Sequence, residues 1–273
     1  MRPGPSDALI DSLATAAHAA ADAAARATLA HFRRAGLAVD NKAEGGFDPV
    51  TAADREAERA IRTVLAELRP QDGLIGEEEA ARSGSSGIDW VFDPIDGTRG
   101  FMAGTPTWGT LIAATRGGVP IYGLIDQPYI GERFEGAPGP GGFARLASRH
   151  GTQPLATRQG VGLAQAVLFS TFPEVGTPRE RQGFAAVAER ARLTRYGMDC
   201  YAYALLAAGH VDLVIEAGLS AYDIAAPIAV ITAAGGMVTD WRGGPAHGGG
   251  QVLAAGSAAL HEEVLALLAP FAG

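Results

Sequence analysis

The chain has 273 residues, of which 47% are hydrophobic and 19% charged, with a formal net charge of −8 at pH 7 and a single cysteine. This length and composition indicate one large or two fused globular domains, while an acidic balance without a lysine or arginine cluster argues against a nucleic-acid partner. The lone Cys200 excludes an internal disulfide framework and Cys-x-x-Cys zinc sites, and it fits a reducing, cytoplasmic location.

Helical spacing of leucine and alanine predicts a long first helix from about Leu9 to Gly36. Aspartates and arginines interrupt it, so it lacks the apolar core of a signal peptide or a membrane span, and we expect no membrane partner. Thr51 is expected to cap a second helix that runs to about Leu68, with Asp54 at the capping-box position. Asp54 could therefore be only a cap, or it could pack beside the site and support the residues that line it.

Carboxylates follow the next two predicted strands. A short strand at 74–76 is followed by three glutamates, and a Ser/Gly loop at 83–87 leads into a buried strand at 88–92. Since Pro94 has no N–H to donate, we expect sheet pairing to stop where Asp93 begins the acidic segment. The acids should therefore lie at the end of a strand.

Two hairpins are predicted after this segment. Strand-like runs at 110–115 and 119–126 are joined by an Arg-Gly-Gly turn, and runs at 133–135 and 143–146 flank a Pro/Gly-rich tip. We place a lobe boundary after residue 148, with an α+β lobe at 1–148 that carries most of the acids.

The second lobe, residues 149–273, alternates strands with helices, which is typical of an α/β arrangement. The predicted strands are 167–170, 211–216, 237–241 and 252–254, and the predicted helices are 179–192, 200–208, 224–234 and 258–268. The fold class expected from the pattern alone is therefore an α+β half followed by an α/β half.

The segment Asp93-Pro94-Ile95-Asp96-Gly97-Thr98 combines features of a cation site and a phosphate site. Asp93 and Asp96 supply two carboxylates, and Gly97 permits close backbone approach. Thr98 can begin a helix whose free N–H groups and positive dipole end favour an anion such as phosphate. The simpler interpretation is a strand-to-helix turn in which Asp96 or Thr98 is only an N-cap.

Asp223 lies immediately before a predicted helix, so by itself it would also be interpreted as an N-cap. Together with Glu77, Asp93 and Asp96 it would complete a carboxylate cluster, and crowded carboxylates raise each other's pKa. Divalent cations relieve this repulsion. Oxygen-only ligands without histidine or cysteine point to Mg²⁺, which typically bridges to a substrate phosphate.

These blocks resemble the signature blocks of the inositol monophosphatase superfamily, and the resemblance spans nearly the whole chain. Its carriers are Gly76–Glu78, Asp93–Thr98, Tyr222–Ala226, the glycine pair 235–236, and Lys42, Asp48, Val50, Thr51 and Asp54 near the amino terminus. The resemblance implies a layered αβαβα fold with the active site between two lobes. It also implies a metal-dependent phosphatase for small phosphate monoesters that is often a homodimer.

By this resemblance, Glu77, Asp93 and the carbonyl of Ile95 bind a first Mg²⁺, and Asp93, Asp96 and Asp223 bind a second, with two or three ions per site. Each of these positions is filled in this sequence. In such an arrangement the cations clamp the attacking and leaving oxygens of an in-line displacement. No phospho-enzyme is needed.

The resemblance also assigns the groups that act on water and phosphate. Thr98 paired with Asp48, together with Glu77 through the metal, would position the attacking water, and the N–H groups of Gly97 and Thr98 would hold phosphate. Lys42 is expected in a loop near phosphate, or else as a solvated lysine. These assignments complete the expected catalytic set.

Two stretches, Thr98–Phe101 and Gly197–Tyr203, are more similar to the histidinol-phosphate phosphatase branch than to the inositol branch. Asp199 and Glu216 would offer two anions to the ammonium and imidazole of histidinol phosphate, whereas neutral inositol does not require the second acid. Asp199 could instead be only an N-cap. Arg99 could contact phosphate or simply cover a surface.

The sequence is also compatible with three different functions. One is an inositol-1-monophosphatase or another small-metabolite phosphatase of the same superfamily. Another is a haloacid-dehalogenase-type phosphatase, which would form an aspartyl-phosphate, although its motif separates the two aspartates by one residue and here Pro94 and Ile95 intervene. The third is a phosphometabolite-binding module that kept the fold but lost turnover.

Overall fold

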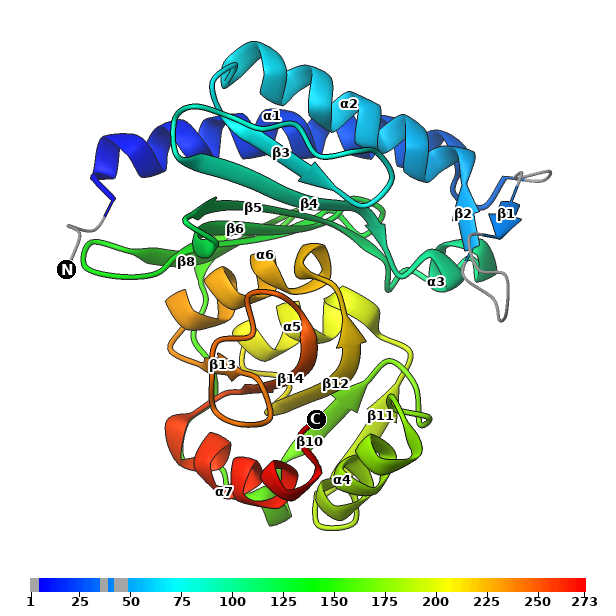
Figure 1. Cartoon of the computed structure of the whole chain (residues 1–273), viewed down its shortest axis with the longest axis vertical. Helices are drawn as coiled ribbons and strands as arrows, with labels where there is room; N and C mark the ends of the chain where they lie inside the picture. Colours follow the sequence, from blue (N-terminus) through cyan, green and yellow to red (C-terminus); the bar gives the residue numbers. More distant parts are fainter. Residues whose placement is uncertain (1–4, 35–38, 42–48) are drawn as a thin grey trace.

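A computed structural model describes residues 5–34, 39–41 and 49–273. The chain forms five layers that follow one another down the long axis (Figure 1). Two long helices cover a large sheet, two helices lie beneath this sheet, and a smaller sheet with two outer helices completes the molecule. The expected layered αβαβα fold is confirmed.

The outer helical layer consists of α1 (Asp7–His31) and α2 (Ala52–Leu68). Alanines on α1 are fully buried against Ile61 and Leu65 of α2, and the short side chains let the two helices approach closely. The capping box of Thr51 and Asp54 begins α2 as predicted. However, α1 ends at His31 and not near Gly36, because Arg33 adopts a left-handed conformation (φ 58°).

The large sheet has seven strands in sequence order, β3 to β9. These are β3 (Gly73–Gly76), β4 (Ile88–Asp96), β5 (Gly109–Arg116), β6 (Val119–Gln127), β7 (Glu132–Ala137), β8 (Phe143–Ser148) and β9 (Gly151–Pro154). Only the β3–β4 pair is parallel, and both predicted hairpins are present. A separate two-stranded sheet pairs β1 (Val39–Asn41) with β2 (Pro49–Thr51).

The expectation that pairing stops at Asp93 is wrong. Asp93 pairs with Leu111, and after a register shift Asp96 pairs with Gly109, so β4 continues through the acidic motif. The bulge spans Pro94, whose carbonyl accepts a hydrogen bond from the Thr110 hydroxyl at 2.8 Å. The Thr110 hydroxyl thus satisfies the Pro94 carbonyl within the bulge, and the ladder resumes at Asp96.

Between the two sheets lie α5 (Asp199–Ala207) and α6 (Ala221–Ala233). The helix α6 contacts strands of both sheets, including β6 and β13. One hydrophobic cluster accordingly contains Leu111 and Phe134 from the large sheet together with Val214 and Val252 from the small one. The two halves of the molecule share this core.

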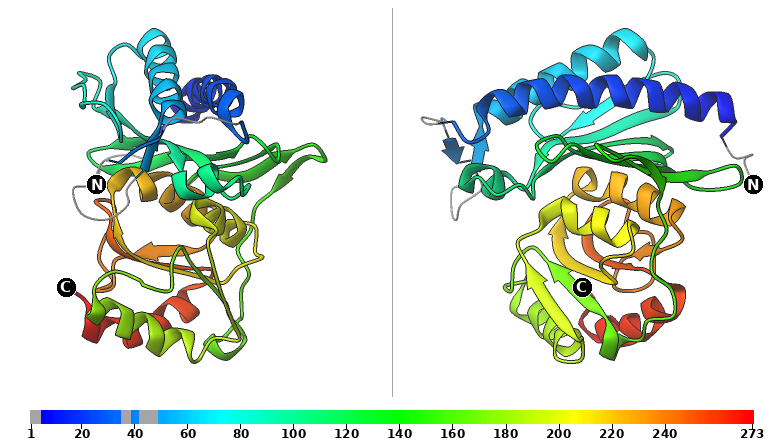
Figure 2. Two further views of the ribbon diagram at one scale, coloured as in Figure 1. Left: turned by 90° about the vertical axis from the view of Figure 1, so that its right-hand side faces the viewer. Right: turned by 180° about the vertical axis from the view of Figure 1, so that it is seen from behind.

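The small sheet has the order β11-β10-β12-β14-β13. Its strands are β10 (Val167–Ser170), β11 (Leu193–Tyr196), β12 (Leu213–Leu219), β13 (Met237–Thr239) and β14 (Gly250–Ala255). Its outer face is covered by α4 (Pro178–Ala188) and α7 (Ala258–Leu268), as the side views show (Figure 2). The short 3-10 turns η1 (Leu163–Gln165) and η2 (Ala269–Phe271) lie beside α7.

The predicted helix at 179–192 is too long at its end, because α4 ends at Ala188 and the chain then forms β11, which was not predicted. Strand β9 was also missed, and it extends the large sheet to Pro154. The lobe division at 148/149 stays a prediction. No helix in the described part of the chain is long and apolar enough to cross a membrane.

Candidate active site

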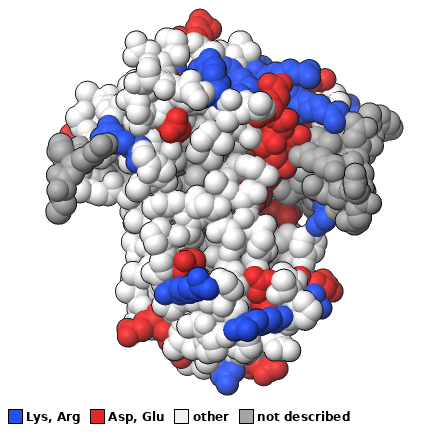
Figure 3. Space-filling model, viewed as in Figure 1, with Lys and Arg blue, Asp and Glu red and all other residues white. Residues whose placement is uncertain are grey.

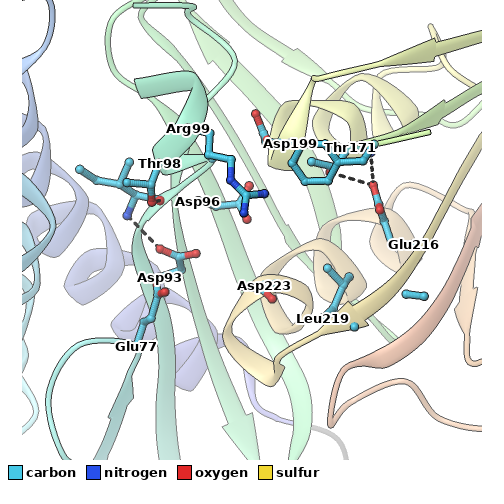
Figure 4. Close-up of a pocket in the computed structure, with 15 residues that line it drawn as sticks. Glu77, Asp93, Asp96, Thr98, Arg99, Thr171, Asp199, Glu216, Leu219 and Asp223 are labelled. Carbon is cyan, nitrogen blue, oxygen red and sulfur yellow. Dashed lines mark hydrogen bonds between the residues drawn. The ribbon is translucent and has the colours of Figure 1, made fainter. Parts of the chain in front are cut away.

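A pocket of about 320 Å³ opens where the large sheet meets the small one. Acidic side chains gather near this junction on the face shown in Figure 3. The pocket is lined by Glu77, Asp93, Ile95, Asp96, Gly97, Thr98, Arg99, Thr171, Phe172, Asp199, Glu216, Ala217, Gly218, Leu219 and Asp223. Figure 4 shows side chains from both halves pointing into the same space. Every predicted site residue of the described chain therefore lines this pocket.

Three of these acids, Asp93, Asp96 and Asp223, place carboxylate oxygens within 4.8 Å of one another. Burial and then the neighbouring charges, that of Glu77 first, hold the pKa of Asp93 well above its usual range. Burial and the charges of Asp199 and Asp223 do the same for the pKa of Asp96. Such a cluster favours either protons or a cation, and its oxygen-only donors fit a hard divalent cation.

A backbone N–H orients each of the three carboxylates. Ile95 N donates to Asp93 Oδ1 at 2.9 Å, and Ser220 N donates to Asp223 Oδ2 at 2.7 Å. Asp96 Oδ2 accepts from Cys200 N at 2.5 Å. These hydrogen bonds restrict how each carboxylate can turn, so the backbone itself orients the cluster.

The N-cap residue of each helix shows whether the acids at helix starts serve only as caps. Helix α3 (Thr98–Ala103) has Gly97 as its N-cap residue and no side-chain cap, so neither Asp96 nor Thr98 serves as one. Helix α5 has Met198 at its N-cap position, so Asp199 is not a simple cap either. Asp223 does belong to the capping box of α6, and it joins the acid cluster as well.

Thr98 is held by two acceptors in its surroundings. Its hydroxyl lies 3.2 Å from the carbonyl oxygen of Ile95 and 3.3 Å from Asp54 Oδ1. The other oxygen of Asp54 accepts from the backbone N–H of Thr51 at 2.8 Å and from its hydroxyl at 2.5 Å. Burial raises the pKa of Asp54. The capping box therefore aims the second oxygen of Asp54 at the site.

This contact places Asp54 directly behind Thr98, which agrees with the expectation that Asp54 packs beside the site or supports its residues and shows that it is more than a cap. The expected partner of Thr98, Asp48, lies outside the described residues, as does Lys42. A signal for Asp54 was present in the sequence, because the capping box uses only one of the two carboxylate oxygens. The oxygen left over had no assigned partner.

Gly97 lies directly against Asp199 of the second half at the site. It adopts φ 86°, and a Cβ built on it would lie 2.8 to 2.9 Å from the carboxylate of Asp199. A side chain at this position would therefore clash as well as strain the backbone. Asp199 in turn has φ 45°, a conformation that aspartate tolerates better than most residues. The absence of a side chain at Gly97 therefore leaves the space that the Asp199 carboxylate occupies.

Asp199 is half-buried and Glu216 is buried at the far side of the pocket. Burial raises the pKa of Asp199 to about 6, while a hydrogen bond from Thr107 and the charge of Arg99 lower it. Burial likewise raises the pKa of Glu216 to about 7. Glu216 Oε1 accepts from Thr171 N at 2.6 Å and from Thr171 Oγ1 at 2.9 Å, and its Oε2 accepts from Ser170 Oγ at 3.3 Å.

Sequence reasoning missed the loop that follows β10. Thr171 and Phe172 line the pocket, and the guanidinium carbon of Arg99 lies 4.9 Å from the centre of the Phe172 ring. A signal existed, because the predicted strand 167–170 ends just before these residues. Ligands of parallel α/β sheets bind beyond the carboxyl ends of their strands.

Comparison with known proteins gives this geometry its context. The inositol monophosphatase family model matches residues 9–270. The bifunctional phosphatase IMPL2 of Arabidopsis thaliana is 41% identical over 87% of this chain and 67% of its own length. A histidinol-phosphatase of Mycobacterium tuberculosis is 38% identical over 92% of this chain and 95% of its own length. An inositol-1-monophosphatase of Rhizobium meliloti is 33% identical over 82% of each chain.

Among solved structures, an inositol monophosphatase from Zymomonas mobilis is 38% identical, with a TM-score of 0.82 over 97% of this chain and 99% of its own. The family consists of metal-dependent phosphatases that act on small phosphate substrates. The acid cluster agrees with that chemistry. The family match and these relatives span nearly the whole chain, which therefore belongs to the inositol monophosphatase family and is a phosphomonoesterase.

Proposed function

We propose that this protein is a Mg²⁺-dependent histidinol-phosphatase, which hydrolyses L-histidinol phosphate to L-histidinol and phosphate in histidine biosynthesis. One observation carries the choice of substrate: Asp199 and Glu216 line the same pocket as the metal-site acids. Two carboxylates suit the ammonium and imidazole of histidinol, whereas neutral inositol needs no second acid. Relatives named histidinol-phosphatase at 32–38% identity support the proposal.

Mg²⁺ would be held by Glu77, Asp93, Asp96, Asp223 and the Ile95 carbonyl. When bound, it would lower the pKa of a coordinated water and offset the charge of the phosphate. Side chains of the protein would orient the attacking water and accept its proton. The Thr98 hydroxyl, fixed between Ile95 and Asp54, can accept a hydrogen bond from the attacking water and pass its own proton towards Asp54. Because Thr98 would direct water itself at the phosphate, the reaction needs no phospho-enzyme.

Phosphate would lie at the amino-terminal end of α3, where the N–H groups of Gly97 and Thr98 have no partner within the helix. The leaving alcohol would then extend towards the far side of the pocket. There Asp199 and Glu216 would bind its two nitrogen-bearing groups. The raised pKa of both acids fits a site in which a substrate cation replaces solvent.

The deciding experiment compares phosphate release from histidinol phosphate and inositol 1-phosphate by purified protein with Mg²⁺ and after chelation. We expect a much higher kcat/KM for histidinol phosphate and no turnover without the cation. A preference for inositol 1-phosphate would overturn the substrate and favour an inositol-1-monophosphatase, an activity that the name of a relative 33% identical carries.

Two further outcomes bear on the binding module and on the haloacid-dehalogenase-type mechanism. If neither ester is hydrolysed, nor fructose bisphosphate or phosphoadenosine phosphate, a binding module without turnover becomes the better interpretation. If phosphate from the substrate is trapped covalently on Asp93, the chemistry is that of a haloacid-dehalogenase-type enzyme and not a direct attack by water.

We also propose a homodimer in the cytoplasm, as expected from the family resemblance and the cysteine content. The chain has a mass of 28.0 kDa. Size-exclusion chromatography with light scattering should therefore give about twice this mass. A mass of one chain at micromolar concentration would overturn the dimer.

A further inference from the structure

An aromatic side chain forms part of the pocket wall opposite the metal-site acids. Phe172 follows the carboxyl end of β10, lines the pocket, and keeps 41% of its surface exposed. Single exposed rings are common on protein surfaces, but this ring borders an acid-lined pocket and offers a flat face on which another ring can stack. Neither the proposed metal site nor the proposed phosphate site at the start of α3 uses this ring. Its position in the pocket wall therefore needs a separate explanation.

Arg99 holds the ring from the other half of the molecule. Its guanidinium carbon lies 4.9 Å from the ring centre, which is cation–π contact. In Figure 4 the Arg99 side chain extends across the pocket between Thr98 and Thr171. Arg99 directly follows Thr98 in the first turn of α3, where the phosphate is proposed to bind. The contact with Phe172 therefore links the ring to the proposed phosphate site. The guanidinium covers one face and leaves the remaining ring surface open.

Glu216 fixes the loop that carries the ring. It accepts hydrogen bonds from the backbone and hydroxyl of Thr171 at 2.6 and 2.9 Å, and from Ser170 at 3.3 Å. Ser170 Oγ also lies 3.3 Å from the carbonyl oxygen of Phe172. Three donors thus share one buried carboxylate within the two residues that precede the ring. The backbone at Phe172 is thereby set by the same acid that is proposed to meet the substrate.

We infer that Phe172 is a specificity residue whose open face stacks against a flat ring in the leaving group, with Arg99 packed on its opposite face. The substrate class is a phosphate monoester that carries a planar aromatic or heteroaromatic ring three carbons from the ester oxygen. This inference rests on the proposed function, because the imidazole of histidinol phosphate is such a ring. Glu216 then acts partly as a positioning residue for Phe172.

The test uses two esters that differ only in the flatness of the ring: 3-phenylpropyl phosphate and 3-cyclohexylpropyl phosphate. Neither has an ammonium or an imidazole, so the ratio of their kcat/KM values measures stacking separately from charge. We expect the Mg²⁺-loaded enzyme to prefer the phenyl ester by about fivefold, through KM. In Phe172→Leu this ratio should fall to about one, and Phe172→Tyr should restore it.

A matched control is Tyr196→Leu. Tyr196 is also 41% exposed, lies on the edge strand β11, and is outside the pocket. This variant should keep the wild-type ratio of kcat/KM values. That result would show that the phenyl preference is not lost whenever any exposed ring is removed. A ratio near one in the wild type, or an unchanged ratio in Phe172→Leu, would overturn the stacking role.

These outcomes are separable from failure of the proposed function. If the enzyme prefers inositol 1-phosphate to histidinol phosphate but still prefers the phenyl ester, the substrate identity is wrong and the ring inference survives. If it prefers histidinol phosphate while the phenyl preference is absent, the substrate identity survives and the ring inference falls. Melting temperatures of all variants should match the wild type, since both mutated rings are exposed.

Discussion

At the residue scale, Asp93 holds a unique position in the acid cluster. It is buried, and Glu77, Asp96 and Asp223 all raise its pKa. We expect Asp93→Asn to reduce kcat by at least about a thousandfold, because an amide cannot offset the charge of the cations that the cluster is built to hold. Phosphate release with saturating Mg²⁺ measures this effect.

The same substitution should leave the metal-free protein folded and at least as stable, because it removes a buried charge that is repelled by its neighbours. Thermal unfolding in EDTA checks this. Asp22→Asn is the control for loss of one carboxylate, since Asp22 is exposed, lies outside the pocket and pairs with Arg133. Near-normal turnover by Asp93→Asn would refute the metal-site assignment.

Asp199 is the residue that should separate one substrate from another. Asparagine is the suitable replacement, because it preserves size and tolerates the observed φ of 45° better than alanine does. We expect Asp199→Asn to lower kcat/KM for histidinol phosphate by roughly tenfold to a hundredfold, the usual effect of losing a charge-assisted hydrogen bond. Hydrolysis of p-nitrophenyl phosphate should fall much less. Equal losses for both esters would remove Asp199 from substrate selection.

At the scale of elements, capping boxes at two helix starts supply acids to the pocket region. Thr51 and Asp54 begin α2, and Ser220 and Asp223 begin α6. In both cases the box holds a carboxylate through one oxygen and fixes the direction of the other. A cap and a functional role are therefore compatible at these positions, because one side chain fulfils both.

Thr51→Ala tests this coupling. Loss of the cap should lower the free energy of unfolding by about 1 kcal/mol. It should also lower kcat, because Asp54 loses the Thr51 hydroxyl that fixes it towards Thr98. Thr177→Ala is the matched control, since Thr177 forms an equivalent capping box at the exposed start of α4 and does not line the pocket. It should lose similar stability and keep kcat. Equal kcat in both variants would contradict the coupling.

The elements also show what the sequence could predict. Local signals were sufficient for α2 and α7 and for both hairpins, because caps, periodicity and glycine turns act over a few residues. They were insufficient for β11, a four-residue edge strand that is mostly exposed and has no alternating pattern. Likewise the acids of one contiguous motif were predicted, whereas Phe172 required knowledge of which loop faces Arg99 across the pocket.

At the scale of the whole molecule, the shared core explains why a site built from two halves has a fixed geometry. Helices α5 and α6 pack between the sheets, and their first turns carry Asp199 and Asp223. The same cluster of buried side chains joins Leu111 of the large sheet to Val252 of the small one. The acids of β4 are therefore held opposite those of the second half by the core itself, and relative motion of the halves would disrupt packing.

Concentrating buried acids between the layers should make the metal-free protein less stable as pH rises. Burial raises the pKa of Glu216 from 4.5 to about 7 in the folded state. Below pH 4.5 both states are protonated and there is no penalty. Between pH 4.5 and 7 the unfolded chain releases this proton while the folded chain keeps it, so the free energy of unfolding falls. Above pH 7 the loss is constant.

Glu216→Gln isolates this contribution, because glutamine does not titrate and the other buried acids act equally in both proteins. The difference in free energy of unfolding between wild type and variant, measured by denaturant titration in EDTA, should shift by up to about 3 kcal/mol against the wild type from pH 4.5 to 7. A difference that stays flat with pH would mean that the pKa of Glu216 is the same in the folded and unfolded states, and that its hydrogen bonds from Thr171 offset the effect of its burial.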